Sequence, residues 1–363
     1  MNILITGIHG FIGSNLVASF VNQHSIYGVD ILSLQKDGVL NTFGWNELGT
    51  IPSVDVVIHL AGKAHDTKNT LSEKEYFDIN VGLTQKIFQY YLKSSASKFI
   101  IFSSVKAVAD SVIEEHLTEK VTPNPQTPYG KSKLQAENYI LDELEKWENG
   151  KMGNGGMGER YTSTERQNDY TSESEWGKGR TGEGLKGERV HDFTNGGEHI
   201  EKKVYILRPC MIHGPGNKGN LNLLYNISQK GYPWPLGAFE NKRSLCSIQN
   251  ITFVVQQLIE KDIEPGIYQV ADDEALSTNE LIELMASSQN KKAKIWHIPV
   301  KLIKTTARVG DFSHLPLNSE RLKKLTESYV VSNQKIKKAL GIEKMPVSAE
   351  DGFKKTFESF KKG

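Results

Sequence analysis

The sequence has little cysteine, no long apolar run and no excess of charge of one sign. Cys210 and Cys246 are the only cysteines in 363 residues, and no C-x-x-C pair occurs, so a disulfide framework is excluded and a zinc site is disfavoured. No stretch of about 18 apolar residues exists, which excludes a membrane-spanning helix. Lys and Arg total 44 against 43 Asp and Glu. The resulting net charge of +1 disfavours a nucleic-acid partner.

The first residues also lack the features of a secretory signal peptide. They contain no basic segment, and the apolar run is broken at Gly7. We therefore expect a cytoplasmic protein with no bound metal and no membrane partner.

The N-terminal part of the chain, over positions 1–150, alternates short apolar runs with longer segments of helical spacing. Near-continuous Val and Ile runs separated by helices predict an α/β fold with a parallel sheet covered on both faces. The predicted strands span residues 2–6, 26–30, 54–60, 98–103 and 203–207, and the predicted helices span residues 12–21, 75–93 and 131–147. A helical pattern at 251–261 and a strand at 266–270 are interpreted as a return to the sheet.

Residues 149–200 differ from the rest of the chain. This segment holds 12 of the 32 glycines, and only 9 of its 52 residues are apolar. Such a composition cannot bury enough surface to offset the entropy of ordering. We predict an inserted, mostly disordered surface loop, which a short linker could replace without loss of the fold.

A glycine-rich turn follows the first predicted strand and opens the first helix. Gly7, Gly10 and Gly13 are spaced as G-x-x-G-x-x-G, which gives a tight turn, close backbone approach to a diphosphate and close packing of helix on strand. Asp30 ends the second strand, where a carboxylate can accept both hydroxyls of an adenosine ribose and would repel a 2′-phosphate. This arrangement predicts a Rossmann-type, doubly wound sheet that binds NAD rather than NADP.

A second motif carries candidate acid–base chemistry. Tyr129 and Lys133 are four residues apart at the start of a helix and so share one face. An ammonium beside a phenol favours the phenolate, which lowers the pKa of the tyrosine. Ser103 and Ser104 follow the preceding strand, at the edge where open α/β sheets bind ligands.

With these motifs the chain resembles the extended short-chain dehydrogenase/reductases of the NAD-dependent nucleotide-sugar epimerase/dehydratase family, including UDP-glucose 4-epimerases. The matching stretches are TGIHGFIG at 6–13, Asp30, VIHLAG at 57–62, Asn80, FSS at 102–104, YGKSK at 129–133 and LRPCMIHGPG at 207–216. The resemblance implies that Tyr129 is the general base and acid, supported by Lys133 and by Ser104, with Ser103 as the alternative serine.

The resemblance also implies ligand contacts. Cofactor contacts would come from Gly7, Gly10, Phe11, Ile12, Gly13, Asp30, Leu60, Ala61, Gly62, Lys63, Asn80, Ser103, Tyr129, Lys133 and Pro209. Substrate contacts would come from Ser104, Asn220 and Arg243, the last two holding the nucleotide diphosphate. The implied organisation is an NAD-binding domain at 1–209, to which 249–271 returns, and a smaller nucleotide-sugar-binding domain at 210–248 and 272–363. Relatives also suggest a homodimer through the helix at 75–93.

One difference from the family's pattern reduces the number of reactions that the chain is expected to catalyse. The family's 4,6-dehydratases carry an Asp-Glu pair after the catalytic serine or threonine, whereas Val105 and Lys106 follow Ser104 here. The stretches at 105–110 and 231–237 resemble instead a polysaccharide-associated subgroup acting on UDP-N-acetyl-hexosamines. We therefore expect hydride transfer at C4 of a UDP-hexose in surface polysaccharide biosynthesis. The alternatives are an NADH-dependent 4-keto-reductase of a UDP-4-keto-6-deoxy-hexosamine, or a non-catalytic cofactor-binding regulator.

Overall fold

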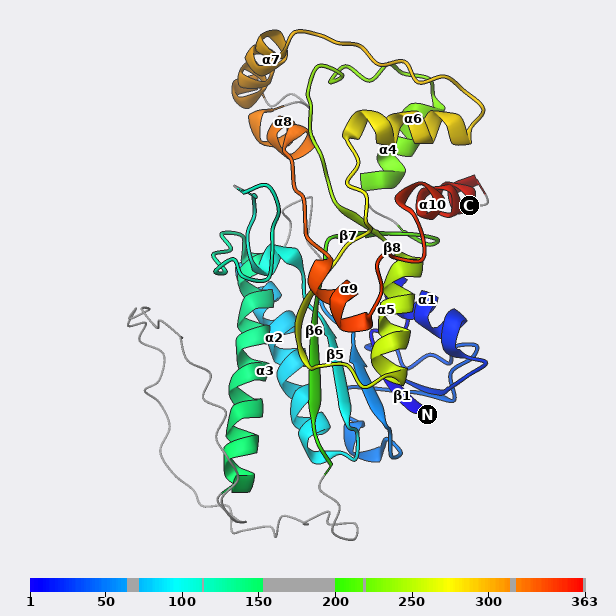
Figure 1. Ribbon diagram of the computed structural model, residues 1–363, viewed down its shortest axis with the longest axis vertical. Helices are drawn as coiled ribbons and strands as arrows, with labels where there is room; N and C mark the ends of the chain where they lie inside the picture. The colour runs from blue at the N-terminus through cyan, green and yellow to red at the C-terminus, as the bar shows by residue number, and fades with distance from the viewer. Residues whose placement is uncertain (64–71, 113, 153–199, 218–219, 314–317, 362–363) are drawn as a thin grey trace.

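Seven parallel strands form the centre of the N-terminal part of the protein, in the order β3-β2-β1-β4-β5-β6-β9 (Figure 1). The computed structural model describes residues 1–63, 72–112, 114–152, 200–217, 220–313 and 318–361. The strands of this sheet are β1 (Asn2–Thr6), β2 (Ser25–Val29), β3 (Asn41–Phe43), β4 (Val56–His59), β5 (Lys98–Phe102), β6 (Lys203–Pro209) and β9 (Gly266–Val270). The predicted doubly wound parallel sheet is confirmed.

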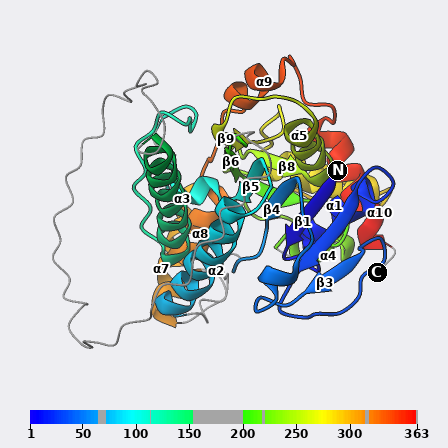
Figure 2. The ribbon, with the colours of Figure 1, turned by 90° about the horizontal axis from the view of Figure 1, so that it is seen from below.

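Helices cover both faces of this sheet. Helices α1 (Phe11–Phe20) and α5 (Ile248–Glu260) pack together on one face, and α2 (Glu73–Lys93) and α3 (Pro128–Met152) pack together on the other, as Figure 2 shows. Each face has its own apolar core, one around Leu16 and Val254 and one around Phe88 and Phe99. Since strands buried on both faces need apolar side chains on both, the uninterrupted Val and Ile runs follow directly.

The C-terminal region forms a third core beyond the carboxyl edge of the sheet. It contains α4 (Asn220–Gln229), α6 (Thr278–Ser288), α7 (Val300–Ser313), α8 (Ser319–Thr326) and α10 (Ala349–Lys361), while α9 (Gln334–Leu340) packs beside β9. A small parallel sheet of β7 (Met211–His213) and β8 (Leu245–Ser247) links this region to the strands below. The buried ring of His213 stacks on Phe353 at 3.9 Å and so holds α10 against β7.

Most predicted elements differ from the observed bounds by only a few residues, and two differences are larger. Strand β3 was not predicted, because three residues are too short to show a periodicity. Helix α3 runs to Met152, so the first four residues assigned to the insertion are helical. The composition change near Gly150 suggested an end there, but one exposed helical glycine costs only about 1 kcal/mol. Residues 153–199 of the predicted insertion lie outside the described residues.

Candidate active site

The carboxyl ends of the strands gather most of the residues singled out by sequence. In the sheet register, Thr6 of β1 lies between Val29 and His59, and Phe102 of β5 pairs with Leu207 of β6. Asp30, Leu60, Ser103 and Pro209 therefore lie at one edge, next to the reversal of strand order at β1 and β4. In open α/β sheets this is where ligands bind.

The glycine turn has the shape that a diphosphate needs. Gly7 has φ +70°, and a Cβ there would lie 2.9 Å from the backbone nitrogen of Ala61. A Cβ on Gly13 would lie 2.5 Å from the carbonyl oxygen of Gly7, so only glycine lets α1 approach β1 this closely. Gly10 is the exposed N-cap of α1 and has no capping side chain. The next backbone N–H groups, in the first turn of α1, are those that a helix leaves without an internal partner and that an anion can accept from.

Asp30 lies beside this turn. One carboxylate oxygen accepts from the backbone nitrogen of His9 at 3.1 Å, and the other accepts from the nitrogen of Ile31 at 2.8 Å. The acidic side chain is thereby fixed at the end of β2, close to the start of α1. Together, the glycine turn and this carboxylate fit the diphosphate and adenosine ribose of a dinucleotide.

A buried chain of hydrogen bonds connects β1, β4 and α2 beneath the site. Thr84 Oγ1 donates to the carbonyl of Asn80 at 2.7 Å, so it accepts from His59 Nε2 at 3.0 Å. His59 Nδ1 then accepts from Thr6 Oγ1 at 2.7 Å. Burial, followed by the charge of Lys133, lowers the pKa of His59 to about 3, so the ring is neutral. His59 therefore connects β1, β4 and α2 and has a structural role.

Asn80 fixes the backbone that follows β4. Its Oδ1 accepts from the nitrogen of Lys63 at 2.7 Å, and its Nδ2 donates to Ser132 Oγ at 3.0 Å. A Cβ on Gly62 would lie 2.8 Å from Asn80 Oδ1 and 3.3 Å from Lys133 Nζ. The segment after β4 is therefore held close to the start of α3.

Tyr129 lies in the first turn of α3 and forms a side-chain hydrogen bond with Ser104. Burial raises the pKa of Tyr129, while this hydrogen bond lowers it. Ser104 Oγ also accepts from the nitrogen of Lys106 at 3.1 Å, which orients the serine. By contrast, Ser103 Oγ donates to Glu137. The geometry thus favours Ser104 over Ser103 as the partner of the tyrosine.

Lys133 lies one turn further along α3, and its Nζ donates to the carbonyl of Phe102 at 3.0 Å. Burial lowers the pKa of Lys133 to about 8, and the carboxylate of Glu137 opposes that shift. From the motif we expected Lys133 to lower the pKa of Tyr129. In the structure Ser104 is the group that does so, because the amine of Lys133 is directed to the end of β5.

A buried ion pair that the sequence analysis missed supports this part of the site. Arg208 Nε donates to Glu137 Oε1 at 3.0 Å, and Nη2 to Oε2 at 2.5 Å, with both residues almost completely buried. Glu137 also accepts from Ser103. Two signals could have revealed the pair: Glu137 lies four residues after Lys133, and Arg208 is a charge within a buried strand.

The predicted substrate residues lie in the C-terminal region. Arg243 is half-buried, exchanges backbone hydrogen bonds with Leu276 and donates from Nε to the carbonyl of Glu327 at 3.2 Å. Burial lowers the pKa of Arg243, and Glu327 raises it. The backbone of Asn220 begins α4, but its side chain lies outside the described set.

The remaining predicted cofactor residues all lie near this edge. Phe11 and Ile12 begin α1, Leu60 and Ala61 donate backbone hydrogen bonds to Thr6 Oγ1, and Pro209 ends β6.

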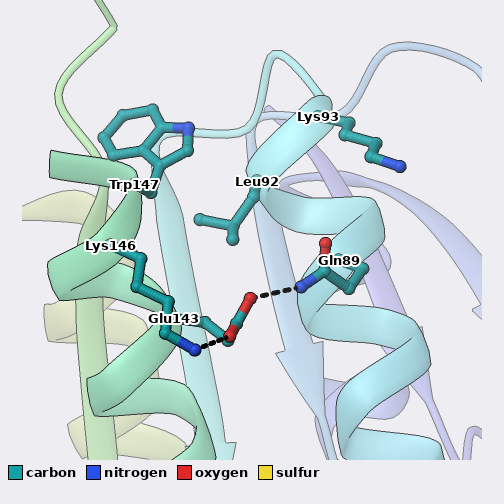
Figure 3. A pocket seen from close by; sticks show the side chains of 6 residues that line it. All are labelled: Gln89, Leu92, Lys93, Glu143, Lys146 and Trp147. Atoms are coloured by element: carbon teal, nitrogen blue, oxygen red, sulfur yellow. Dashed lines mark hydrogen bonds and ion pairs between the residues drawn. The ribbon is translucent and has the colours of Figure 1, made fainter. Parts of the chain in front are cut away.

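A surface hollow of about 310 Å³ lies elsewhere, between the C-terminal halves of α2 and α3 (Figure 3). There Glu143 accepts from Gln89 at 2.8 Å and from Lys146 at 2.8 Å. Glu143 lies almost four turns beyond Tyr129 on the same helix, a rise of roughly 20 Å. The hollow is therefore separate from the candidate active site.

The described residues lack both a membrane-spanning helix and a cluster of metal-binding side chains. None of the helices in these ranges is long and apolar enough to cross a membrane. The same ranges contain no group of three or more His, Cys, Asp or Glu side chains that could hold a metal ion.

The sequence of this chain is similar to those of known proteins. Residues 3–149 match the model of the NAD dependent epimerase/dehydratase family. UDP-glucose 4-epimerase of Vibrio cholerae is 26% identical over 373 aligned positions, covering 99% of this chain and 95% of its own. A 4-epimerase of Escherichia coli O157:H7, named for N-acetyl-α-D-glucosaminyl-diphospho-ditrans,octacis-undecaprenol, is 25% identical and covers 93% of this chain and 85% of its own.

Solved structures share the fold. The UDP-glucuronic acid 4-epimerase of Bacillus cereus in complex with NAD superposes with a TM-score of 0.65 at 17% identity, over 100% of this chain and 99% of that one. With its glycine turn, its parallel sheet and the full-length similarity to a UDP-glucose 4-epimerase, the chain is a UDP-sugar 4-epimerase-like, NAD-dependent enzyme whose residues 3–149 match the NAD dependent epimerase/dehydratase family.

Proposed function

We propose that this enzyme inverts the configuration at C4 of a UDP-hexose of the UDP-N-acetylglucosamine type, in surface polysaccharide biosynthesis. The observation that carries the proposal is the Ser104–Tyr129 hydrogen bond at the carboxyl edge of the sheet, with Lys133 one turn along the same helix. Tyr129 is the catalytic acid and base, and Ser104 holds the same oxygen of the sugar.

NAD, when bound, would supply the acceptor and then the donor of the C4 hydride, and inversion requires that the hydride come back to the opposite face of C4. The chain's own residues do the rest. Gly7, Gly10 and Gly13 receive the diphosphate, and Asp30 receives the adenosine ribose and disfavours a 2′-phosphate. Tyr129 removes the proton from the C4 hydroxyl and later gives it back. Lys133, charged below a pH of about 8, holds the nicotinamide ribose.

The positions after Ser104 support epimerisation over dehydration. Val105 is buried, and Lys106 Nζ donates to the carbonyl of Asp110 at 2.7 Å and lies 4.1 Å from the centre of the Tyr329 ring. Neither residue offers the acid or base that elimination of water requires. Reduction of a 4-keto sugar would use the same serine, tyrosine and lysine. These residues therefore do not distinguish an epimerase from a reductase, and an experiment must do so.

The test is product analysis by NMR with UDP-N-acetylglucosamine, UDP-glucose, a UDP-4-keto-6-deoxy sugar and a polyprenyl-diphosphate-linked N-acetylglucosamine. We expect inversion at C4 of UDP-N-acetylglucosamine without added NADH. NADH-dependent loss of a ketone would instead identify a reductase, and accumulation of a 4-keto-6-deoxy sugar would identify a dehydratase. Turnover of the polyprenyl-linked sugar alone would overturn the assignment of a UDP carrier.

A further inference from the structure

Residues 291–311 carry a local charge that the whole chain does not have. This segment contains six Lys and Arg and one acidic residue, a net charge of +5, whereas the chain as a whole has +1. The six basic residues are all exposed: Lys291, Lys292, Lys294, Lys301, Lys304 and Arg308. The acidic residue, Asp311, accepts two hydrogen bonds from Ser319.

Large apolar side chains lie exposed among these charges. The exposed fractions are 57% for Trp296, 58% for Leu302 and 56% for Val309. A folded protein normally buries such residues in part, and isolated exposures are common. Here all three lie in the same short segment and are interleaved with lysines. Such a composition suits a surface that binds anionic groups and apolar chains at the same time.

Helix α7 separates these side chains into rows. Ile303 and Ala307 face inward and are buried in the C-terminal core. On the exposed side, Lys301 is seven residues from Arg308, and Leu302 is seven residues from Val309, so each pair forms a row along the helix. One row is basic and the row next to it is apolar.

The preceding segment presents Trp296 from a fixed backbone. The nitrogen of Trp296 donates to the carbonyl of Trp234 at 2.8 Å, and its carbonyl accepts from Gly237 at 3.1 Å. Figure 1 shows the chain between α6 and α7 crossing the top of the molecule, at the end opposite the N-terminal sheet. The chain between α6 and α7, which includes Trp296, and α7 itself therefore lie at one end of the protein.

We propose that this end, residues 291–311, docks on the surface of a membrane that contains anionic phospholipids. Basic side chains are attracted to anionic headgroups, and adjacent Trp, Leu and Val side chains can enter the boundary between headgroups and acyl chains. Nucleic acid is a poorer fit, because a phosphate-binding surface does not need an exposed apolar row beside the charges. The docking is peripheral, and it departs from the expectation of no membrane partner.

Sedimentation of the full chain with vesicles tests the proposal. We expect binding to vesicles of phosphatidylcholine and phosphatidylglycerol mixed roughly two to one, little binding to phosphatidylcholine alone, and weaker binding as the salt concentration rises. Lys301→Glu/Lys304→Glu should weaken binding to the anionic vesicles by about tenfold or more. Lys338→Glu/Lys344→Glu, the same charge change at two exposed positions in and after α9, should leave it within about twofold.

A second variant tests the apolar row without changing charge. Leu302→Ser/Val309→Ser should also weaken vesicle binding, and its unchanged melting temperature would show that the fold is intact. Absence of wild-type binding to anionic vesicles, equal losses in the two lysine variants, or undiminished binding of the serine variant would each overturn the proposal. Tighter binding to duplex DNA than to vesicles would replace it with a nucleic-acid surface.

Discussion

Tyr129 and its neighbours show how single side chains acquire a role from their surroundings. The half-buried phenol of Tyr129 lies against the edge of the Tyr76 ring, with centroids 6.0 Å apart, and is hydrogen-bonded to Ser104. Burial alone raises its pKa, which disfavours the phenolate, so the hydrogen bond from Ser104 acts in the opposite direction. The reactivity proposed for this tyrosine thus depends on a residue from a different, earlier element of the chain.

Replacing Tyr129 by Phe should abolish turnover while NAD still binds. The variant keeps the ring and its packing but removes the proton-transfer group, which typically contributes about 10²–10⁴-fold in rate. We expect kcat to fall by at least about 100-fold with the Kd for NAD within a few-fold of wild type. The measurements are steady-state kinetics and cofactor titration. Activity within about tenfold of wild type would exclude Tyr129 as the general base.

Glu137→Gln should change the pH dependence of the enzyme. The Glu137 carboxylate raises the pKa of Lys133 against burial, so its neutralisation moves that pKa below about 8. Lys133 then loses its proton at lower pH, and the alkaline limb of kcat/KM against pH should shift to lower pH. An unshifted limb would contradict a link between Glu137 and Lys133.

The same substitution leaves Arg208 buried without its counter-charge, which typically costs about 3–5 kcal/mol. Glu137→Gln/Arg208→Met removes both charges and should recover most of that stability in urea unfolding. The shifted pH limb should remain in this double variant, which separates the electrostatic role of Glu137 from its structural one.

At the scale of elements, two lysine side chains cap the C-termini of two helices. Lys202 Nζ donates to the carbonyls of Tyr91, Ser94 and Ala96, at 3.0, 2.7 and 2.7 Å, where α2 ends. Lys98 Nζ does the same for Leu258, Ile259 and Lys261 at the end of α5. A cation at a helix C-terminus satisfies carbonyls that have no partner inside the helix and complements the helix dipole.

Lys202→Met should destabilise the protein by about 3 kcal/mol, because it keeps the buried stem but leaves carbonyl acceptors without donors. The matched variant Lys98→Met should cost less, since Lys98 is less buried and water can replace its ammonium. Urea unfolding with an unchanged m-value is the measurement. A larger loss in Lys98→Met would contradict this ranking.

At the scale of the whole molecule, the C-terminal region contacts the strand end that carries Ser104, the serine proposed to act with Tyr129. The Tyr329 hydroxyl donates to the carbonyl of Ala109 at 2.7 Å and lies 3.2 Å from that of Val105. The backbone of Tyr329 also pairs with the segment around Arg243. One tyrosine therefore connects the proposed diphosphate site to the segment directly after Ser104.

Tyr329→Phe should raise KM for the nucleotide sugar several-fold while the Kd for NAD stays unchanged. Loss of this hydroxyl should also cost about 1 kcal/mol in stability. Tyr268→Phe is a matched control, because that hydroxyl donates locally to Glu264 in the N-terminal sheet. If both variants raised KM equally, Tyr329 would have no specific role between the two regions.

Much of this protein could be predicted from the sequence because its signals are local. The strands at 2–6 and 266–270 match β1 and β9, since continuous apolar runs fix buried strands. The glycine turn and the Tyr129–Lys133 spacing each depend on a few neighbouring residues, and most of the residues predicted to contact the cofactor lie at one edge of the sheet, whereas Asn220 and Arg243 lie in the C-terminal region. The homodimer and the domain boundaries stay predictions.

Only the tertiary structure decided which polar groups form hydrogen bonds and ion pairs with one another across the sheet. The sequence left Ser103 and Ser104 open, and the choice follows from α3, where Glu137 contacts the first serine and Tyr129 the second. The Arg208–Glu137 pair, the neutral His59 and the contact of Tyr329 with the segment after Ser104 have the same origin. Buried polar groups must find partners, and those partners are set by packing between elements that are distant in sequence.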